Sequence, residues 1–467
     1  MNTRKTHNLR PWLALLSICW LVTPVSAQTR SLRIVTYNIE DDINGATTPL
    51  PGLIAPPNSI NNVQAGGVLE GIGEEIAGND PAQPLDILAL EETTSNPITV
   101  APIVNGLNAF YGQAGMYSNS TYQATESGGD VADGNGPNAI VFNTRTLQLL
   151  SSVPVDPAGG TSKLGSSSGE YREVMRYEFA PAGVAPATSN EFYIYVSHYK
   201  SGTGSANEND RFGEAQIIRT NEAVELPADA RVLYLGDFNI TSSGEASYQT
   251  ILSNTAPNGI YQGQGLDPMN PTNNPTINWG TTTTITNILA METDSTTDLR
   301  YRDDLQVMTT NIYYGAAGGL NYVPGTYHTF GNNGTTPYFG SVNSGANTSL
   351  NNRLATNGPA FISAAQLYLD LANASDHLPV VADYTIPLPA PVITGFSLAG
   401  TNLVLDVANG ITGAVFTVLM STNLSLPFTN WTALATNTVT GGTFTFTVTN
   451  AAVDPAAPGM FFLLQEE

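Results

Sequence analysis

The chain of 467 residues contains a single cysteine, Cys19. This cysteine lies in an N-terminal segment that we expect to be removed, so the mature chain would have no thiol. Thiol catalysis, cysteine metal ligands and disulfide bonds are thereby excluded. A secreted protein without disulfides depends for its stability on its hydrophobic core and on any bound metal.

Basic residues are also scarce. The chain has 16 lysines and arginines against 39 acidic residues, which gives a formal net charge of −23. A strongly acidic protein repels polyanions at long range, which disfavours tight, non-specific binding to duplex nucleic acid, although a divalent metal would offset the repulsion locally. Acidic chains can be disordered, but 41% hydrophobic residues suffice for a core. The composition predicts a folded protein.

A long hydrophobic run is missing everywhere except near the N-terminus. Arg4, Lys5 and Arg10 precede an apolar stretch at 12–22, and small residues follow at 25–27. This pattern is typical of a secretory signal peptide over residues 1–27, and the apolar stretch is too short to span a bilayer comfortably. An uncleaved anchor helix is the alternative. We predict export to the extracellular space or periplasm, no transmembrane span, and a mature chain with 13 basic and 39 acidic residues.

Short apolar runs rich in Ile, Val and Tyr recur between residues 32 and 384. They occupy 32–35, 85–90, 138–142, 192–196, 232–235, 305–308 and 378–384. Their length and the lack of clean polar alternation suit strands that are buried on both faces. Apolar residues at helical spacing predict helices from Val68 to a C-cap at Gly78 and over 209–226. Together these features predict a layered α/β domain over residues 28–385.

The remaining segments have a different composition. Residues 262–297 and 313–357 are rich in Asn, Thr, Gly and Pro, which indicates long surface loops or insertions. Prolines spaced along 386–391 predict a linker. Beyond it, short runs of alternating apolar residues predict a small all-β sandwich module over 392–467. Its sequence has a vague likeness to C-terminal modules of exported bacterial proteins, so attachment to a cell surface or polymer is one expectation.

Polar residues stand at the ends or starts of six of the predicted strands. These clusters are Thr36-Tyr37-Asn38, Glu91-Glu92, His198, Asp237-Phe238-Asn239, Arg302-Asp303-Asp304 and Ser375-Asp376-His377. In a sheet of mixed direction, strand ends and the starts of antiparallel neighbours share one edge, so all six can converge. Carboxylate and amide oxygens suit a hard cation such as Mg²⁺ or Mn²⁺. A histidine with nearby aspartates suits general acid–base work, and the whole set fits metal-assisted attack of water on phosphorus.

The ordered set of motifs resembles the endonuclease/exonuclease/phosphatase superfamily, which includes DNase-like nucleases, abasic-site endonucleases, neutral sphingomyelinases and inositol polyphosphate phosphatases. The resemblance covers residues 32 to 384. It is carried by Thr-Tyr-Asn-Ile, Leu-x-Glu-Glu, Ser-His-Tyr-Lys-Ser-Gly, Gly-Asp-Phe-Asn, Arg-x-Asp and Ser-Asp-His-x-Pro in this order. The resemblance implies a four-layered α/β/β/α sandwich of the DNase-like type and a metal-dependent phosphoesterase.

The resemblance also implies roles for individual residues. Glu92 would be the principal Mg²⁺ ligand, with Asn38 beside it and Asp376 next to the metal or its waters. Asp237 would position or deprotonate the attacking water, and Asn239 would hold the phosphate and that water. Asp304 would orient His377, which would act as an acid–base or stabilise the developing charge. His198 would contact a phosphate oxygen. The expected substrate-binding residues are Arg172, Lys200 and Arg211.

The sequence departs from the family pattern in three places, one of which is the length of the insertions before Asp304 and before Asp376. The family usually has Gln before the metal-binding Glu, and here Glu91 leaves open which carboxylate binds the metal. The acidic residue that usually orients the equivalent of His198 has no clear counterpart, and the stretch 170–173 is a candidate.

Three functions remain open at this point. The motif around His198, followed by Arg211, favours an extracellular nuclease, whereas the acidic composition favours a phosphomonoesterase or a lipid or sugar phosphodiesterase of the same superfamily. A non-catalytic binding or adhesion protein on this scaffold is the alternative of another class. A competent residue at each motif position favours the enzyme.

Overall fold

A computed structural model of the chain supplies the structure. It describes residues 28–40, 67–76, 82–120, 137–155, 171–172, 174–279, 286–294, 296–316, 318–355, 362–389, 391–400, 402–410, 415–439, 442–449 and 460–466. The predicted signal peptide at 1–27 lies outside these residues. Within them, no helix is long and apolar enough to cross a membrane. One compact unit spans Thr29–Pro387, and Leu388–Glu467 belong to another.

Two sheets form the centre of the first unit. The first has the order β11-β13-β1-β2-β4-β3, with β12 paired to β13. Its strands are β1 (Gln28–Asn38), β2 (Ile87–Glu91), β3 (Tyr117–Asn119), β4 (Ala139–Asn143), β11 (Asn321–Tyr322), β12 (His328–Thr329) and β13 (Val380–Leu388). β1 and β2 run parallel, and the last residue pair in their register is Asn38 with Glu91.

The second sheet has the order β5-β6-β7-β8-β10-β9. Its strands are β5 (Leu147–Val155), β6 (Val174–Pro181), β7 (Phe192–His198), β8 (Val232–Asp237), β9 (Gly265–Leu266) and β10 (Asp304–Thr309). β7 and β8 are parallel and end on the pair His198 and Asp237. β10 is antiparallel to β8 and starts opposite Asp237 with Asp304. Both sheets therefore present strand ends that carry the predicted polar clusters.

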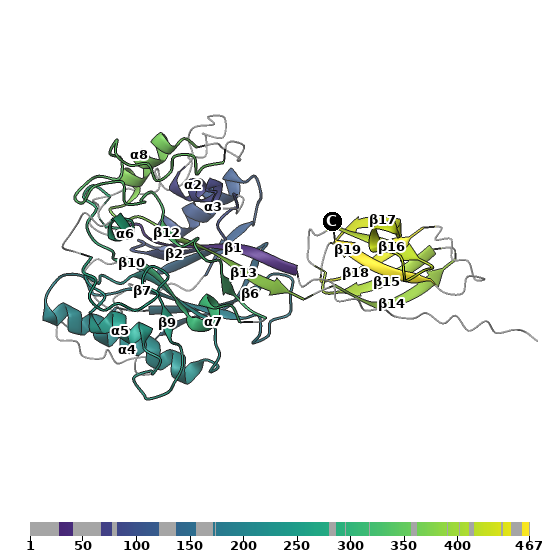
Figure 1. Cartoon of the computed structure of the whole chain (residues 1–467), viewed down its shortest axis with the longest axis horizontal. Helices are drawn as coiled ribbons and strands as arrows, with labels where there is room; N and C mark the ends of the chain where they lie inside the picture. Colours follow the sequence, from purple (N-terminus) through teal and green to yellow (C-terminus); the bar gives the residue numbers. More distant parts are fainter. Residues whose placement is uncertain are drawn as a thin grey trace, which may run out of the picture. The chain divides into compact units, whose positions relative to one another are not determined.

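The two sheets stack face to face over a shared core. Leu32 and Ile34 of β1 pack in the same cluster as Ile194 of β7 and Leu233 of β8, and all four are fully buried. The residues that alternate with these along each strand, such as Val35 of β1, point to the outer face of their sheet. Helices α2 (Val68–Glu74), α3 (Ala101–Phe110) and α8 (Ala364–Ala374) cover the first sheet, and α4 (Ser205–Glu225) and α5 (Ala246–Leu252) cover the second (Figure 1).

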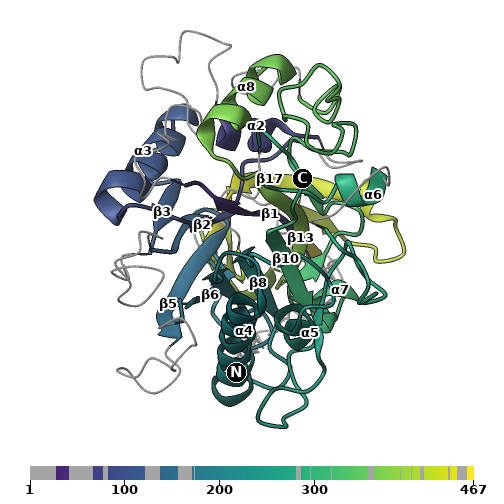
Figure 2. The same cartoon turned by 90° about the vertical axis from the view of Figure 1, so that its left-hand side faces the viewer.

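The view along the sheets shows the four layers in order, with α2, α3 and α8 on one side and α4 and α5 on the other (Figure 2). The short helices α6 (Thr286–Leu289) and α7 (Thr310–Tyr313) lie in connections, and a single π-helical turn over Asn96–Val100 leads into α3. The predicted α/β/β/α sandwich is confirmed, because buried strands with apolar residues on both faces need two covering layers each.

The first helix ends earlier than its apolar spacing predicts. It stops at Glu74, and Glu75 is extended with φ −68° and ψ 134°. Arg33 of β1 donates from Nη1 to the carbonyl oxygens of Ile72 and Glu75, at 2.7 and 3.0 Å. A buried arginine from a strand thus satisfies the end of the helix in place of a glycine cap. The predicted cap, Gly78, lies outside the described residues.

The segments interpreted as surface loops are irregular but partly internal. Trp279, Leu320, Phe330 and Val342 are each fully buried, and Phe330 and Val342 pack in the core beneath α8. The interpretation as surface insertions is therefore wrong for these parts. Their rich content of Asn and Thr supports turns, while scattered large apolar residues anchor the turns to the core.

Gly236 allows strands β7 and β8 to lie very close together next to the predicted catalytic residues His198 and Asp237. It has φ +136°, and a Cβ built on it would lie 1.9 Å from the carbonyl oxygen of Ser197 in the neighbouring strand. Glycine is the one amino acid that can adopt this φ and also let two backbones approach so closely, because it has no Cβ. The pairing of His198 with Asp237, one residue further along, depends on this glycine.

Replacing Gly236 with alanine is expected to lower the free energy of unfolding of the α/β unit by about 2–4 kcal/mol, because of backbone strain and overpacking. The midpoint of urea unfolding measures this loss. Gly259→Ala is the matched control, since Gly259 has φ +85° with no atom within 4 Å of the added Cβ. Equal losses in the two variants would show that φ alone is responsible and that the contact with Ser197 is unimportant.

The C-terminal unit is the predicted all-β module. One sheet has the order β14-β15-β18 and the other β17-β16-β19. The strands are β14 (Val392–Ala399), β15 (Asn402–Ala408), β16 (Val415–Ser421), β17 (Thr432–Thr438), β18 (Thr443–Val448) and β19 (Phe461–Glu466). Alternate residues of both sheets, such as Leu405, Phe416 and Phe446, form its core. The short 3₁₀ turn Phe428–Asn430 precedes β17.

The first residues of the predicted linker at 386–391 belong to strand β13 in the structure. β13 continues to Leu388, and Ile386 is fully buried in the core between the two sheets of the α/β unit. The proline spacing misplaces the boundary because Pro387 does not interrupt this strand.

Candidate active site

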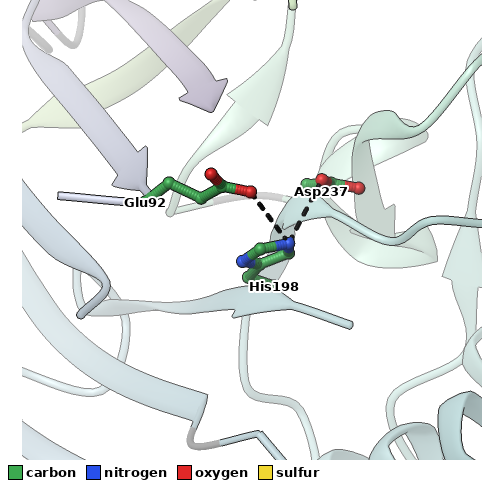
Figure 3. Close-up of side chains that lie close together, drawn as sticks. All are labelled: Glu92, His198 and Asp237. Atoms are coloured by element: carbon green, nitrogen blue, oxygen red, sulfur yellow. Dashed lines mark ion pairs between the residues drawn. The ribbon is translucent and has the colours of Figure 1, made fainter. Parts of the chain in front are cut away.

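Three side chains from three strand ends meet at the edge of the stacked sheets. The Nε2 atom of His198 lies 3.4 Å from Oε1 of Glu92 and 3.5 Å from Oδ2 of Asp237. Figure 3 shows the two carboxylates approaching the same ring nitrogen. One possible ligand atom from each residue lies within 4.8 Å of the other two, so this group has the dimensions of a metal site.

Asn38 ties the two carboxylates of this group together. Its Nδ2 donates to Oε1 of Glu92 and to Oδ2 of Asp237, both at 3.1 Å, while its Oδ1 accepts the backbone N–H of Glu40. The amide turns its NH₂ group toward the two carboxylates and holds Glu92 and Asp237 in place. That Asn38 binds the metal stays a prediction.

The structure distinguishes the two adjacent glutamates. Glu91 takes the last position of β2, is fully buried, and accepts a hydrogen bond from Thr36 at 3.1 Å. Glu92 has φ +55°. This left-handed conformation is unfavourable for a residue with a Cβ. It breaks the strand alternation and brings the Glu92 carboxylate beside Asn38 and His198, so Glu92 and not Glu91 is the candidate ligand.

Burial makes both candidate ligands hold protons more tightly than usual. It raises the pKa of Glu92 to about 7, although the hydrogen bond from Asn38 opposes the shift. Burial also raises the pKa of Asp237 to about 6, opposed by the positive charge of His377. The half-buried carboxylate of Glu92 and the buried carboxylate of Asp237 repel each other when both are ionised, and a divalent cation between them would offset that repulsion. This donor set fits Mg²⁺ or Mn²⁺.

Asp304 and His377 form a buried pair next to this group. Nδ1 of His377 lies 2.7 Å from Oδ2 of Asp304, and both residues are almost wholly buried. The Nε2 atom faces Asp237 at 3.8 Å and Asp376 at 3.7 Å. Burial alone would lower the pKa of His377, but the charges of Asp304 and Asp376 raise it well above its usual range. His377 thus has Nδ1 on Asp304 and Nε2 toward Asp237 and Asp376.

A second acidic group includes His377, whose Nε2 also faces Asp237 of the first group. Ligand atoms of Asp294, Asp376 and His377 lie within 4.8 Å of one another. Glu40 stands close to Asp376, and burial followed by the charge of Asp376 raises the pKa of Glu40 to about 7. The structure therefore groups Asp376 with Asp294 and Glu40, and Nε2 of His377 lies between Asp376 and Asp237 at 3.7 and 3.8 Å.

Asn239 lies at the start of the loop that follows Asp237. It has φ +50°, and its backbone N–H donates to Oδ1 of Asp237 at 2.8 Å. Its Nδ2 donates to the carbonyl oxygen of Tyr199 at 3.0 Å, which links the ends of β8 and β7. The half-buried side chain thus stands between Asp237 and the segment after His198.

Two of the three predicted substrate-binding residues have internal roles instead. Arg211 is fully buried, pairs with Glu245 at 2.9 Å and donates to the carbonyl oxygens of Lys200 and Gly202. Arg172 is buried and donates to the carbonyl oxygen of Tyr199 at 2.6 Å. Both arginines hold the backbone after β7 through these contacts. Lys200 is half-buried on the same segment, with its backbone N–H on Glu214 at 2.9 Å.

Sequence reasoning missed Asp294 and Glu40 as neighbours of the site. Asp294 forms isolated β-bridges with both Tyr301 and His377, so an irregular segment runs alongside His377. The signal that could have indicated Glu40 is its position two residues beyond Asn38 at a strand end. Asp294 gave no such signal, because it lies within a segment interpreted as a loop. Glu170 and Glu173, the candidate partners of His198, lie outside the described residues.

Comparisons with known proteins give similarity at the level of solved structures. No protein-family model matches the chain, and no curated protein matches it in sequence. The human Nocturnin catalytic domain with bound sulfate anion is 17% identical with a TM-score of 0.39, over 77% of this chain and 97% of that chain.

Two further structures are similar over nearly the same part of this chain. TDP2 of D. rerio, complexed with a single-strand DNA product, is 12% identical with a TM-score of 0.39, over 76% of this chain and 98% of that one. An endonuclease/exonuclease/phosphatase family protein from Bacteroides thetaiotaomicron is 12% identical with a TM-score of 0.36, over 78% and 100%. Because identities and TM-scores are low, family and activity are inferred from the residues of the site.

Proposed function

We propose that this chain is a secreted, divalent-metal-dependent phosphodiesterase of the endonuclease/exonuclease/phosphatase superfamily that acts on nucleic acid. The observation that carries the proposal is the convergence of Glu92, His198 and Asp237 with the buried pair of Asp304 and His377. These residues come from the ends or starts of strands in both sheets. The signal-peptide pattern at 1–27 supports secretion.

Each residue of the site has a chemical task in this proposal. Glu92 and Asp237 would hold Mg²⁺ or Mn²⁺, with Asp376 contributing through the second acidic group; a bound cation supplies charge neutralisation for the phosphate. Asp237 would also accept a proton from an attacking water, and Asn239 would hold that water and a phosphate oxygen. The His377 imidazolium, held by Asp304, would stabilise the charge that develops on phosphorus-bound oxygens or protonate the leaving group. His198 would contact a phosphate oxygen.

The burial of several arginines limits the kind of nucleic acid that could be the substrate. Arg172, Arg211 and Arg302 are buried, and Arg302 is bound to Asp267 at 2.6 Å. A duplex-binding nuclease needs several exposed cations along the phosphates. The proposed substrate is therefore a single strand or short oligonucleotide, for which few phosphate contacts suffice. The same scarcity of exposed cations keeps a phosphomonoesterase or a lipid or sugar phosphodiesterase as the second candidate.

A panel of substrates tests the proposal. The chain from Gln28 onward would be incubated with a single-stranded oligonucleotide, plasmid DNA, RNA, bis-p-nitrophenyl phosphate, p-nitrophenyl phosphate and sphingomyelin, each in Mg²⁺, Mn²⁺ or EDTA. We expect metal-dependent cleavage of diesters, with single strands preferred over duplex. Cleavage of the monoester or the lipid alone would move the chain to the second candidate. No turnover on any substrate would favour a binding or adhesion protein.

Magnesium is expected to raise the melting temperature of the α/β unit more at about pH 8 than at about pH 5. The metal-free pKa values of about 7 for Glu92 and about 6 for Asp237 mean that protons occupy both groups at the lower pH and compete with the metal. Above both values the carboxylates are ionised, and metal binding needs no proton release. Differential scanning calorimetry with and without MgCl₂ measures the effect. A shift that is equal at the two pH values would contradict the assignment of these ligands.

A further inference from the structure

Phe339 is an exposed aromatic residue in a strained backbone conformation. Its side chain is 55% exposed, and its φ is +62°. A large apolar side chain in water and a left-handed backbone at a residue other than glycine are both unfavourable. The ring is held against Tyr338, with ring centroids 4.4 Å apart in an edge-to-face arrangement. The structure thus fixes an aromatic face that points to solvent.

Arg300 adds a cation to this aromatic face. Its guanidinium carbon lies 5.0 Å from the ring centroid of Tyr301 and 5.6 Å from that of Phe339, which are cation–π distances. Its side chain is 37% exposed and lies 3.6 Å from Asp298, itself 35% exposed. An exposed ion pair of this kind is weak. Arg300 therefore differs from the buried Arg172 and Arg211, because its charge can be shared with an incoming anion.

Backbone hydrogen bonds connect this patch to the catalytic histidine. Leu378, next to His377, donates to Thr293 at 2.8 Å, and Thr293 donates to Tyr301 at 2.7 Å. On the other side, Phe339 donates to the carbonyl oxygen of Leu299 at 3.0 Å. Adjacent hydrogen-bonded strands lie about 5 Å apart, so the patch is roughly 10–15 Å from His377. This places it within reach of a nucleotide near the cleaved phosphate.

We propose that Phe339 and Arg300, supported by Tyr301 and Tyr338, form a platform on which a base of the single-stranded substrate stacks. The inference rests on the proposed function and names a subsite for it. Aromatic rings and arginine planes accept any base, because each base has a π-face, and the arginine also attracts the neighbouring phosphate. Stacking would give an acidic protein affinity for nucleic acid that electrostatic attraction to a basic track cannot supply.

Binding of two matched strands tests the platform. A labelled short oligothymidylate and a strand of the same length with abasic residues would be titrated with the full chain in Mg²⁺, in a His377→Ala background so that neither strand is cut. Phe339→Gly removes the ring and suits the positive φ, so it is expected to keep the fold. It should weaken binding of the oligothymidylate by about fivefold or more and change binding of the abasic strand little. Arg300→Gln should weaken both strands.

Tyr314→Ala is the matched control. Tyr314 is 74% exposed and follows the end of β10 opposite to Asp304, so its loss should leave both affinities unchanged. The platform is refuted if Phe339→Gly weakens both strands equally or neither, or if the unmutated platform binds the two strands alike. If the chain binds the base-containing strand more tightly but the wild type hydrolyses no substrate, the proposed function is refuted and the platform is supported. If the wild type shows metal-dependent hydrolysis but binds both strands alike, the platform is refuted and the proposed function is supported.

Discussion

Replacing His377 with alanine is expected to lower kcat for phosphodiester cleavage by about 10²- to 10⁴-fold. Asp304 holds Nδ1 at 2.7 Å and directs Nε2 toward Asp237 and Asp376, so the ring faces the place where the phosphate would bind. The charges of Asp304 and Asp376 raise the pKa of His377 well above its usual range, which favours the positively charged ring that would stabilise a developing anion. Initial rates with a single-stranded oligonucleotide measure the loss.

His328→Ala is the matched control for this variant. His328 bonds to Glu75 at 2.8 Å and to the carbonyl oxygen of Thr326 at 2.6 Å, so both of its ring nitrogens are engaged by groups outside the proposed site. It lies opposite Val381 in the pairing of β12 with β13. Its loss should leave kcat unchanged at a temperature where the protein is folded. A His377→Ala variant that keeps activity within about threefold would remove the histidine from the proposed chemistry.

Replacing Glu92 with glutamine is expected to change activity and stability in opposite directions. Turnover at a fixed metal concentration should fall by at least about 10²-fold, because the variant loses an anionic ligand. The free energy of unfolding without metal should rise by about 1–2 kcal/mol at about pH 8, because a buried charge is removed. The glutamine oxygen can keep the hydrogen bond from Asn38.

The pH dependence of this stability gain has a definite sign. The folded-state pKa of Glu92 is raised to about 7, so the folded protein binds this proton more tightly than the unfolded chain does. The destabilisation by Glu92 therefore grows as pH rises from the unfolded value toward 7 and is absent at about pH 4. Urea unfolding of the wild type and Glu92→Gln at both pH values measures it. A gain that is equal at the two values would contradict the raised pKa.

The fold followed from local patterns to a large extent. Continuous apolar runs such as 192–196 and 232–235 became central strands, since strands covered on both faces have few polar positions. The convergence of Asp237 and Asp304 was predictable because a strand start lies opposite the end of an antiparallel neighbour. The module after residue 391 was predictable from alternation of apolar residues.

Other features depended on contacts that no local pattern contains. Arg211 looked like a phosphate contact, but its partner Glu245 is 34 residues away, and a pairing of that separation leaves no mark in composition. The left-handed φ of Glu92 decides which glutamate faces the site, and nothing in Leu-x-Glu-Glu encodes it. Asp294 reaches His377 from an irregular segment in which Leu299 is buried, and no local pattern predicts that contact.

Hydrolysis of a single-stranded oligonucleotide as a function of Mg²⁺ concentration tests the central claim most directly. The account predicts no cleavage by the wild-type chain in excess EDTA, cleavage restored by added Mg²⁺, and a metal requirement shifted to much higher concentration in Glu92→Gln. Cleavage that continues in EDTA, or a metal response unchanged by Glu92→Gln, would contradict a metal-dependent phosphodiesterase at this site.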